Sequence, residues 1–158
     1  MGLLNSYQRV LYVDIDVHHG DGVENAFMYS NRVYTLSVHR YGPGFFPGSG
    51  AASECGKGRG YGFCTNIPIK HQAGGHEWLD LIIQELDAIC LDFRPEVIVA
   101  CCGADVLSTD PHQALNVCSD AYVRAIEKIT SLKLPTIFLG GGMRIDVKSF
   151  LNQHFRRL

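Results

Sequence analysis

The sequence has no large excess of charge of either sign and no long run of like charges. Its 158 residues carry 14 basic and 16 acidic side chains, which give a formal net charge of −2. Domains that bind nucleic acid through a basic surface usually carry clustered Lys and Arg. The composition therefore predicts no direct nucleic-acid partner.

Long hydrophobic runs are also missing. No stretch approaches the roughly 18 consecutive apolar residues that a membrane helix needs. The N-terminus has no basic segment followed by an apolar segment and a cleavage site, so we expect no secretory signal and no membrane partner. The hydrophobic residues, 46% of the chain, are enough for the core of one domain.

Cysteine pairs spaced as C-x-x-C are absent. The six cysteines lie at positions 55, 64, 90, 101, 102 and 118, and Cys101 and Cys102 fall inside an apolar run. This pattern is typical of packed thiols in a reducing compartment, and not of a disulfide framework or a thiolate zinc site. We therefore expect free cysteines.

Apolar runs alternate with longer amphipathic segments along the chain. Short apolar runs predict strands, and apolar residues at helical spacing predict helices. The expected strands are 9–15, 33–38, 63–67, 97–102 and 135–139, and the expected helices are 23–29, 78–91 and 120–132. Residues 42–62 are too rich in glycine for regular structure.

This alternation predicts the fold class and the position of a site. Near-continuous apolar strands joined by amphipathic helices favour an α/β fold, a three-layer α/β/α domain with a mainly parallel sheet. In such sheets ligands bind outside the carboxyl ends of the strands. Polar residues follow three of the expected strands, at 14–21, 37–39 and 103–105. We expect them to form one site.

The segment "VDIDVHHGDGVE" crowds three aspartates and two histidines behind an apolar run. Ionised side chains at the edge of a core cost desolvation energy, which a bound cation would offset. Asp16 and His18 are two residues apart, so their side chains point to the same side of an extended segment. With Asp105 from another strand end, the set becomes one imidazole and two carboxylates. Three such ligands and an open position are typical of catalytic zinc, whereas magnesium and calcium prefer oxygen ligands alone.

Simpler and different interpretations of these residues stay open at this point. Asp105 can cap the segment after it, and Asp16 can merely begin a turn. The D-x-D of Asp14 and Asp16 also occurs in magnesium-dependent phosphatases with an aspartate nucleophile, although His18 and His19 replace the small hydroxyl residue expected there. The glycines at 140–142 could form a phosphate loop, but no nucleotide-binding glycine motif follows a strand.

Five segments together resemble one known family. In order, they are "LYVDIDVHHGDGVENAF", "LSVHRYGPGFFPGSG", "GKGRGYGFCTNIP", "CGADVLSTDP" and "LGGG". Their sequence and spacing resemble zinc-dependent histone deacetylases of class I, which have the arginase-deacetylase fold. The resemblance covers about residues 3–142. It implies that residues 1–142 form the C-terminal half of a catalytic domain and that 143–158 are an unrecognised tail.

The resemblance also implies roles for individual residues. Asp16, His18 and Asp105 match zinc ligands, and Asp14 and Asp21 match carboxylates that orient a pair of catalytic histidines. Phe46 matches an aromatic wall of the tunnel that holds the acetyl-lysine substrate, and His112 falls at the rim, where the family usually has an apolar residue.

Two potassium ions are implied as further cofactors. The first site comprises Asp14, the backbone carbonyls of Asp16 and His18, the Ser37 hydroxyl and the Val38 carbonyl. The second comprises the carbonyls of Phe27, Ser30, Val33 and Phe63. His19 is expected to be structural, and Asp110 to be either structural or functional.

Two features depart from the family. The only His-His pair, His18 and His19, belongs to the metal motif, so this sequence has no second pair to match the catalytic histidines. In addition, Arg144 stands where the family has a tyrosine that stabilises the oxyanion. A guanidinium can stabilise an oxyanion but is not a neutral donor. We therefore expect a fragment or isoform with little or no activity by itself.

The implied function is zinc-dependent deacetylation of acetyl-lysine in histones or other proteins. The resemblance further implies a chromatin regulator that represses transcription in a corepressor complex, in the nucleus, the cytoplasm or both. The alternative is a non-catalytic, truncated isoform that binds the partners of a deacetylase.

Overall fold

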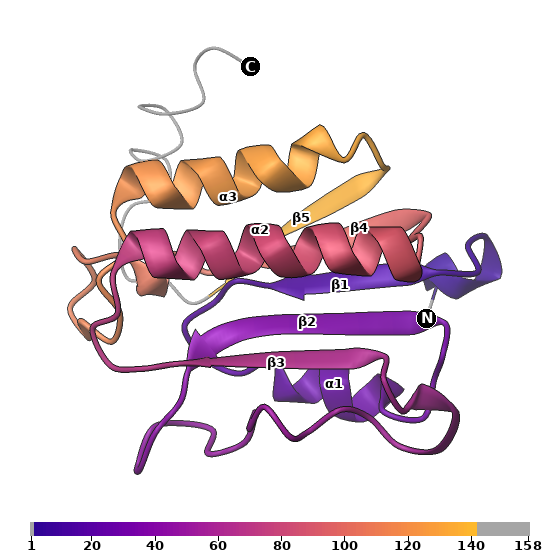
Figure 1. Cartoon of the computed structure of the whole chain (residues 1–158), viewed down its shortest axis with the longest axis horizontal. Helices are drawn as coiled ribbons and strands as arrows, with labels where there is room; N and C mark the ends of the chain where they lie inside the picture. The colour runs from indigo at the N-terminus through magenta and orange to yellow at the C-terminus, as the bar shows by residue number, and fades with distance from the viewer. Residues whose placement is uncertain (1, 142–158) are drawn as a thin grey trace.

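A parallel sheet of five strands organises the part of the chain that the structure describes (Figure 1). The computed structural model describes residues 2–141. The strands are β1 (Val10–Asp14), β2 (Val33–Arg40), β3 (Cys64–Ile69), β4 (Val97–Cys102) and β5 (Thr136–Gly140). The helices are α1 (Asp21–Phe27), α2 (Gly75–Asp92) and α3 (Ser119–Ser131), with short 3-10 turns η1 (Gly2–Asn5), η2 (Gly58–Gly60) and η3 (Ala104–Val106). The strand order is β3-β2-β1-β4-β5, and all neighbours are parallel.

Helices cover both faces of this sheet, which confirms the predicted α/β/α architecture (Figure 1). The connection from β1 through α1 leads to the neighbour on one side, β2, whereas the connections through α2 and α3 lead in the opposite direction. Because parallel crossovers are right-handed, this reversal places α1 on one face and α2 and α3 on the other. The order in which strands are added to the sheet reverses at β1, so a site is expected at that strand's carboxyl end.

The main core lies between the sheet and α2. Apolar residues of this helix recur every three or four positions, and the stripe they form is buried. It includes Trp78, Leu79, Ile82, Leu86 and Ile89. The ring of Trp78 stacks on Tyr122 of α3 with 6.2 Å between ring centroids, so α2 and α3 share one packed layer.

The strand register brings the polar strand ends together. Asp14 pairs in register with Ser37 on one side and with Cys101 on the other. Cys102 pairs with Gly140 at the end of β5. The carboxyl ends of four strands therefore meet at one edge of the sheet.

All six cysteines are free, as the sequence predicts. Burial raises the pKa values of Cys64, Cys101 and Cys102 to about 12, so these thiols stay protonated and unreactive. In residues 2–141 no helix is both long enough and apolar enough to cross a membrane. The predicted tail at 143–158 lies outside the described residues.

Strand β5 exposes apolar side chains on the outer edge of the sheet. Ile137, Phe138 and Leu139 are each 44–45% exposed. Within residues 2–141 no strand pairs with the outer side of β5. An apolar sheet edge of this kind is a template for association with another chain.

We therefore expect the purified 158-residue chain to bind a hydrophobic fluorescent dye and to self-associate as its concentration rises. Phe138→Lys should reduce both effects, because a charge on the edge strand opposes strand pairing. Leu91→Lys is the matched control, since Leu91 is 72% exposed and belongs to α2 and not to the edge strand. Dye titration and analytical ultracentrifugation measure the two effects. A monodisperse wild-type monomer that binds no dye would contradict this expectation.

Candidate metal centre

Three metal-ligating side chains converge at the sheet edge. Asp16 and His18 follow β1, and Asp105 lies in η3 directly after β4. His18 Nδ1 is 3.0 Å from Asp16 Oδ1 and 3.3 Å from Asp105 Oδ2. One ligand atom from each residue lies within 4.8 Å of the other two, which is close enough for all three to bind one ion. The structure thus brings together the three residues that the sequence predicts as zinc ligands.

Backbone amides hold the two carboxylates in place. Asp105 Oδ1 accepts a 3.0 Å hydrogen bond from the Val17 amide. Asp16 Oδ1 accepts a 2.9 Å hydrogen bond from the His18 amide. The side chains of Asp105 and Asp16 are only 7% and 13% exposed, whereas His18 is 37% exposed. The two carboxylates are therefore buried and held by backbone hydrogen bonds, whereas the side of the site formed by the His18 imidazole is open to solvent.

Close negative charges make this site favourable for a cation. Burial, and after it the neighbouring charge of Asp16, raise the pKa of Asp105 to about 6. Two carboxylates that disfavour each other's ionised forms gain stability when a divalent ion lies between them.

Two glycines make room for the carboxylate of Asp16. A Cβ at Gly103 or at Gly141 would collide with Asp16 Oδ2. The chain after β4 and the chain after β5 therefore approach Asp16 more closely than any residue with a side chain permits. The close approach to Asp16 therefore explains why glycine follows both strands, and no phosphate-binding loop is needed to explain it.

Aromatic rings surround the exposed side of His18. The ring of Phe45 stacks on the imidazole at 5.3 Å with an interplanar angle of 3°, and Phe46 meets it edge-on at 5.9 Å. The guanidinium of Arg40 lies 4.1 Å from the centroid of the Phe45 ring. Phe46 is 73% exposed, so its ring is free to contact a ligand. Sequence reasoning missed Phe45 and Arg40, although the Phe-Phe pair was the available signal.

Asp14 and Asp21, the predicted orienting carboxylates, occupy different surroundings. Asp14 is 3% exposed and accepts hydrogen bonds from the Tyr12 hydroxyl at 2.6 Å and the Asp16 amide at 3.0 Å. Burial raises the pKa of Asp14, and these hydrogen bonds oppose the rise. Asp21 is the first residue of α1, where a negative charge stabilises the helix N-terminus.

Two residues of the first predicted potassium site, Asp14 and Ser37, are neighbours in the sheet. Ser37 lies beside Asp14 in the sheet, and its hydroxyl accepts a 3.2 Å hydrogen bond from the Gly20 amide. In the second predicted site, the Phe27 carbonyl accepts from the Ser30 amide at 2.7 Å and the Phe63 carbonyl from the Thr35 amide at 3.1 Å. Each carbonyl keeps a second lone pair for a cation. Both potassium sites stay predictions, as does the contribution of Val33 and Val38.

His19 and His39 belong to a buried polar network. His19 Nε2 is 2.7 Å from Glu24 Oε2, and its Nδ1 is 2.8 Å from the Ser49 hydroxyl. Burial disfavours the charged imidazole, but the hydrogen bond and charge of Glu24 outweigh it and raise the pKa of His19. His39 is fully buried, and burial lowers its pKa to about 4. Both rings already have partners within the fold, so neither is free to transfer protons to a substrate.

His112 and Asp110 form a local pair at the predicted rim. His112 Nδ1 is 3.1 Å from Asp110 Oδ1, which also accepts the His112 amide at 2.8 Å. The His112 side chain is 59% exposed, and that of Asp110 is 2% exposed. Asp110 therefore orients an exposed imidazole and stabilises its turn at the same time.

Comparisons with known proteins agree with this geometry. The model of the histone deacetylase domain family matches residues 2–158. Histone deacetylase 8 of Xenopus laevis is 37% identical over 140 residues, which cover 89% of this chain and 43% of the relative. Putative histone deacetylase 2 of Caenorhabditis elegans is 41% identical and histone deacetylase 1 of Homo sapiens 38%, each over 89% of this chain and over 27% and 29% of the relative. The chain thus spans less than half the length of these curated relatives.

Proposed function

Since the chain belongs to the histone deacetylase domain family, we propose that Asp16, His18 and Asp105 hold a catalytic zinc ion for the deacetylation of lysine side chains. The substrate class is acetyl-lysine in histones or other proteins. Zinc, when bound, supplies Lewis acidity toward a carbonyl oxygen and acidifies a water molecule. Potassium at the two predicted sites, a corepressor complex, and action in the nucleus or the cytoplasm belong to the same proposal.

The observation that carries the proposal is the ligand set. One imidazole and two carboxylates within 4.8 Å of one another leave coordination positions open on the exposed side of His18. Structural zinc sites are usually closed by four protein ligands, whereas catalytic sites keep a position for water or substrate. The imidazole also argues against magnesium, which prefers oxygen ligands.

The chain's own residues would place the substrate. Phe46 stands beside His18 with most of its ring exposed, so it can pack against the apolar stem of an acetyl-lysine. The ring of Phe45 stacks on the imidazole of His18 and limits the rotation of that imidazole. The Val17 amide fixes Asp105, so the ligand carboxylate need not reorient when the substrate enters.

A second function is favoured by the surroundings of Asp14. The carboxylate of Asp14, which resembles an orienting residue, accepts hydrogen bonds from Tyr12 and from a backbone amide, and within residues 2–141 it has no hydrogen bond to an imidazole. This arrangement suits a chain that binds metal and the partners of a deacetylase without turning over substrate itself.

The proposal is tested with a peptide whose acetyl-lysine side chain ends in a metal-chelating hydroxamate. We expect zinc-dependent binding to the 158-residue chain and about tenfold weaker binding by Phe46→Ala. Burying a whole phenylalanine side chain contributes on the order of 1.5–3 kcal/mol, and only part of this ring is covered. Isothermal titration calorimetry measures the affinity of the peptide for the wild type, with and without zinc, and for Phe46→Ala. Tyr61→Ala is the control, because Tyr61 is also exposed but lies beyond η2. Equal binding with and without zinc would refute the proposal.

A further inference from the structure

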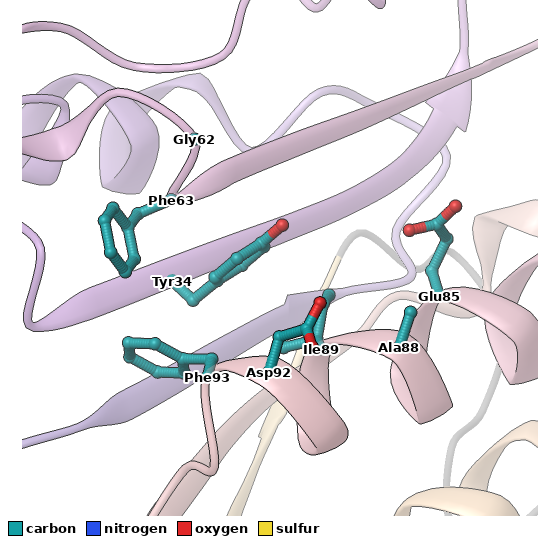
Figure 2. Close-up of a pocket in the computed structure, with 8 residues that line it drawn as sticks. All are labelled: Tyr34, Gly62, Phe63, Glu85, Ala88, Ile89, Asp92 and Phe93. Atoms are coloured by element: carbon teal, nitrogen blue, oxygen red, sulfur yellow. The ribbon is translucent and has the colours of Figure 1, made fainter.

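A cavity lies between α2 and the strands β2 and β3, in a part of the fold that the metal centre does not use (Figure 2). Its volume is about 290 Å³, just below the range of pockets that hold drug-sized ligands. The residues that line it include three aromatic rings and two carboxylates. They are Tyr34, Phe63, Phe93, Glu85 and Asp92, together with Gly62, Ala88 and Ile89.

The three aromatic rings form one cluster. The centroid distances are 5.5 Å between Tyr34 and Phe93, 5.8 Å between Phe63 and Phe93, and 6.2 Å between Tyr34 and Phe63. The interplanar angles of 57–69° mean that the rings do not stack face to face. A cation interacts with an aromatic ring from about 6 Å or less from its centroid. At 5.5–6.2 Å the rings pack against one another, so a cation in the cavity would lie beside the cluster, within that distance of more than one centroid.

Two carboxylates of α2 complete the lining. Glu85 and Asp92 are seven positions apart and therefore lie on the same side of the helix, two turns from each other. Figure 2 shows the Tyr34 side chain between the two phenylalanines and Glu85. Neither carboxylate forms a salt bridge within residues 2–141. Burial raises the pKa of Tyr34, and the negative charges of Glu85 and Asp92 act in the same direction, so the cavity carries a negative potential.

We propose that this cavity binds an organic ammonium cation that carries N-methyl groups. The methyl groups would pack against Tyr34, Phe63 and Phe93, and the positive charge would be attracted by the rings and by the two carboxylates. A trimethylammonium group combines a large apolar surface with a weakly hydrated charge. The aromatic rings favour the apolar surface, and the carboxylates favour the charge.

Other ligand classes match the lining less well. An anion is repelled by Glu85 and Asp92, and a metal ion gains no ligand from the phenylalanine rings. A neutral apolar group suits the rings but gains nothing from the carboxylates. The same ammonium chemistry occurs in free choline-like molecules and in trimethylated lysine side chains of proteins, so the experiment has one arm for each source.

The first arm compares choline with 3,3-dimethylbutan-1-ol, which has the same shape but no charge. Saturation-transfer NMR on the ligand, with the full 158-residue chain at micromolar concentration, gives the dissociation constant. We expect saturable choline binding and much weaker binding of the alcohol. Equal binding of both would overturn the proposal, because it would show an apolar pocket without preference for charge. Absence of saturable binding by any ammonium probe would overturn it as well.

Substitutions locate the binding in this cavity. Glu85→Gln and Asp92→Asn should each weaken choline binding about two- to fivefold, the effect expected of an interaction with a partly exposed cation. Glu77→Gln is the matched control, because Glu77 is an exposed residue of the first turn of α2. Phe63→Leu should weaken choline binding and leave the binding of the alcohol unchanged. Unaltered choline binding in all three cavity variants, with the circular dichroism of the wild type, would contradict the assignment.

The second arm replaces choline with a short peptide that contains one trimethyl-lysine, and compares it with the same peptide containing unmodified lysine. Tighter binding of the methylated peptide than of choline would identify a protein side chain as the source. Equal affinities would identify a free small cation. The cavity variants keep Asp16, His18 and Asp105, so this test is independent of metal binding and of the proposed deacetylation.

Discussion

Replacing Asp105 with Ala should remove nearly all the zinc from the 158-residue chain. The substitution deletes one of three protein ligands and leaves Asp16 and His18, which is too few for a stable tetrahedral site. Changes to groups that merely support a ligand typically lower metal affinity by ~10- to 100-fold, so loss of a ligand should exceed about 100-fold. Metal analysis of protein dialysed against a zinc buffer measures the stoichiometry.

Two further variants make this result specific. Asp80→Ala, an exposed aspartate of α2, should keep the zinc of the wild type. Gly103→Ala should weaken binding without deleting a ligand, because its Cβ would displace the Asp16 carboxylate. Unchanged stoichiometry in Asp105→Ala would show that other residues hold the metal.

The second large effect concerns turnover. The 158-residue chain, purified by itself and loaded with zinc, should hydrolyse acetyl-lysine peptides at or near the background rate. General acid–base catalysis typically contributes ~10²–10⁴ in rate, and it needs an accessible imidazole or an equivalent group beside the substrate. His18 belongs to the metal triad, whereas His19 and His39 are buried and bonded within the fold.

Loss of an oxyanion donor acts in the same direction. Arg144 stands where the resemblance places a tyrosine, and one such donor typically contributes ~10²–10³ in rate. These factors need not multiply, because groups that act as a unit are not additive. Asp16→Ala controls for contaminating deacetylases. Robust turnover that depends on Asp16 would contradict the prediction, and would indicate the exposed His112 with its Asp110 partner as the proton-transfer group.

The strands, and the edge of the sheet that carries the metal site, were predictable because short stretches of the sequence determine them. The apolar run 97–102 is β4 with the same bounds, and the other four strands fall within two residues of the predicted ends. Helix α1 begins at residue 21, two residues before its predicted start, because Asp21 favours a helix N-terminus that apolar spacing does not reveal. Parallel strands then bring Asp16, His18 and Asp105 to one edge.

The contacts between distant segments were not predictable in this way. The stacking of Phe45 on His18 depends on the path of a glycine-rich loop that has no periodic pattern. The link between His19 and Ser49 depends on the same loop. The cavity beside α2 requires the packing of Tyr34 of β2 against Phe93, far away in sequence. Such contacts follow from tertiary packing, which sequence patterns do not encode locally.

X-ray absorption spectroscopy at the zinc edge tests the central claim most directly. The six free cysteines offer the chief competing ligands, and sulfur is readily distinguished from nitrogen and oxygen by its longer bond to zinc. The metal centre of Asp16, His18 and Asp105 predicts a first shell of nitrogen and oxygen at about 2.0–2.2 Å with one imidazole, lost in Asp105→Ala. A sulfur shell at about 2.3 Å would contradict it.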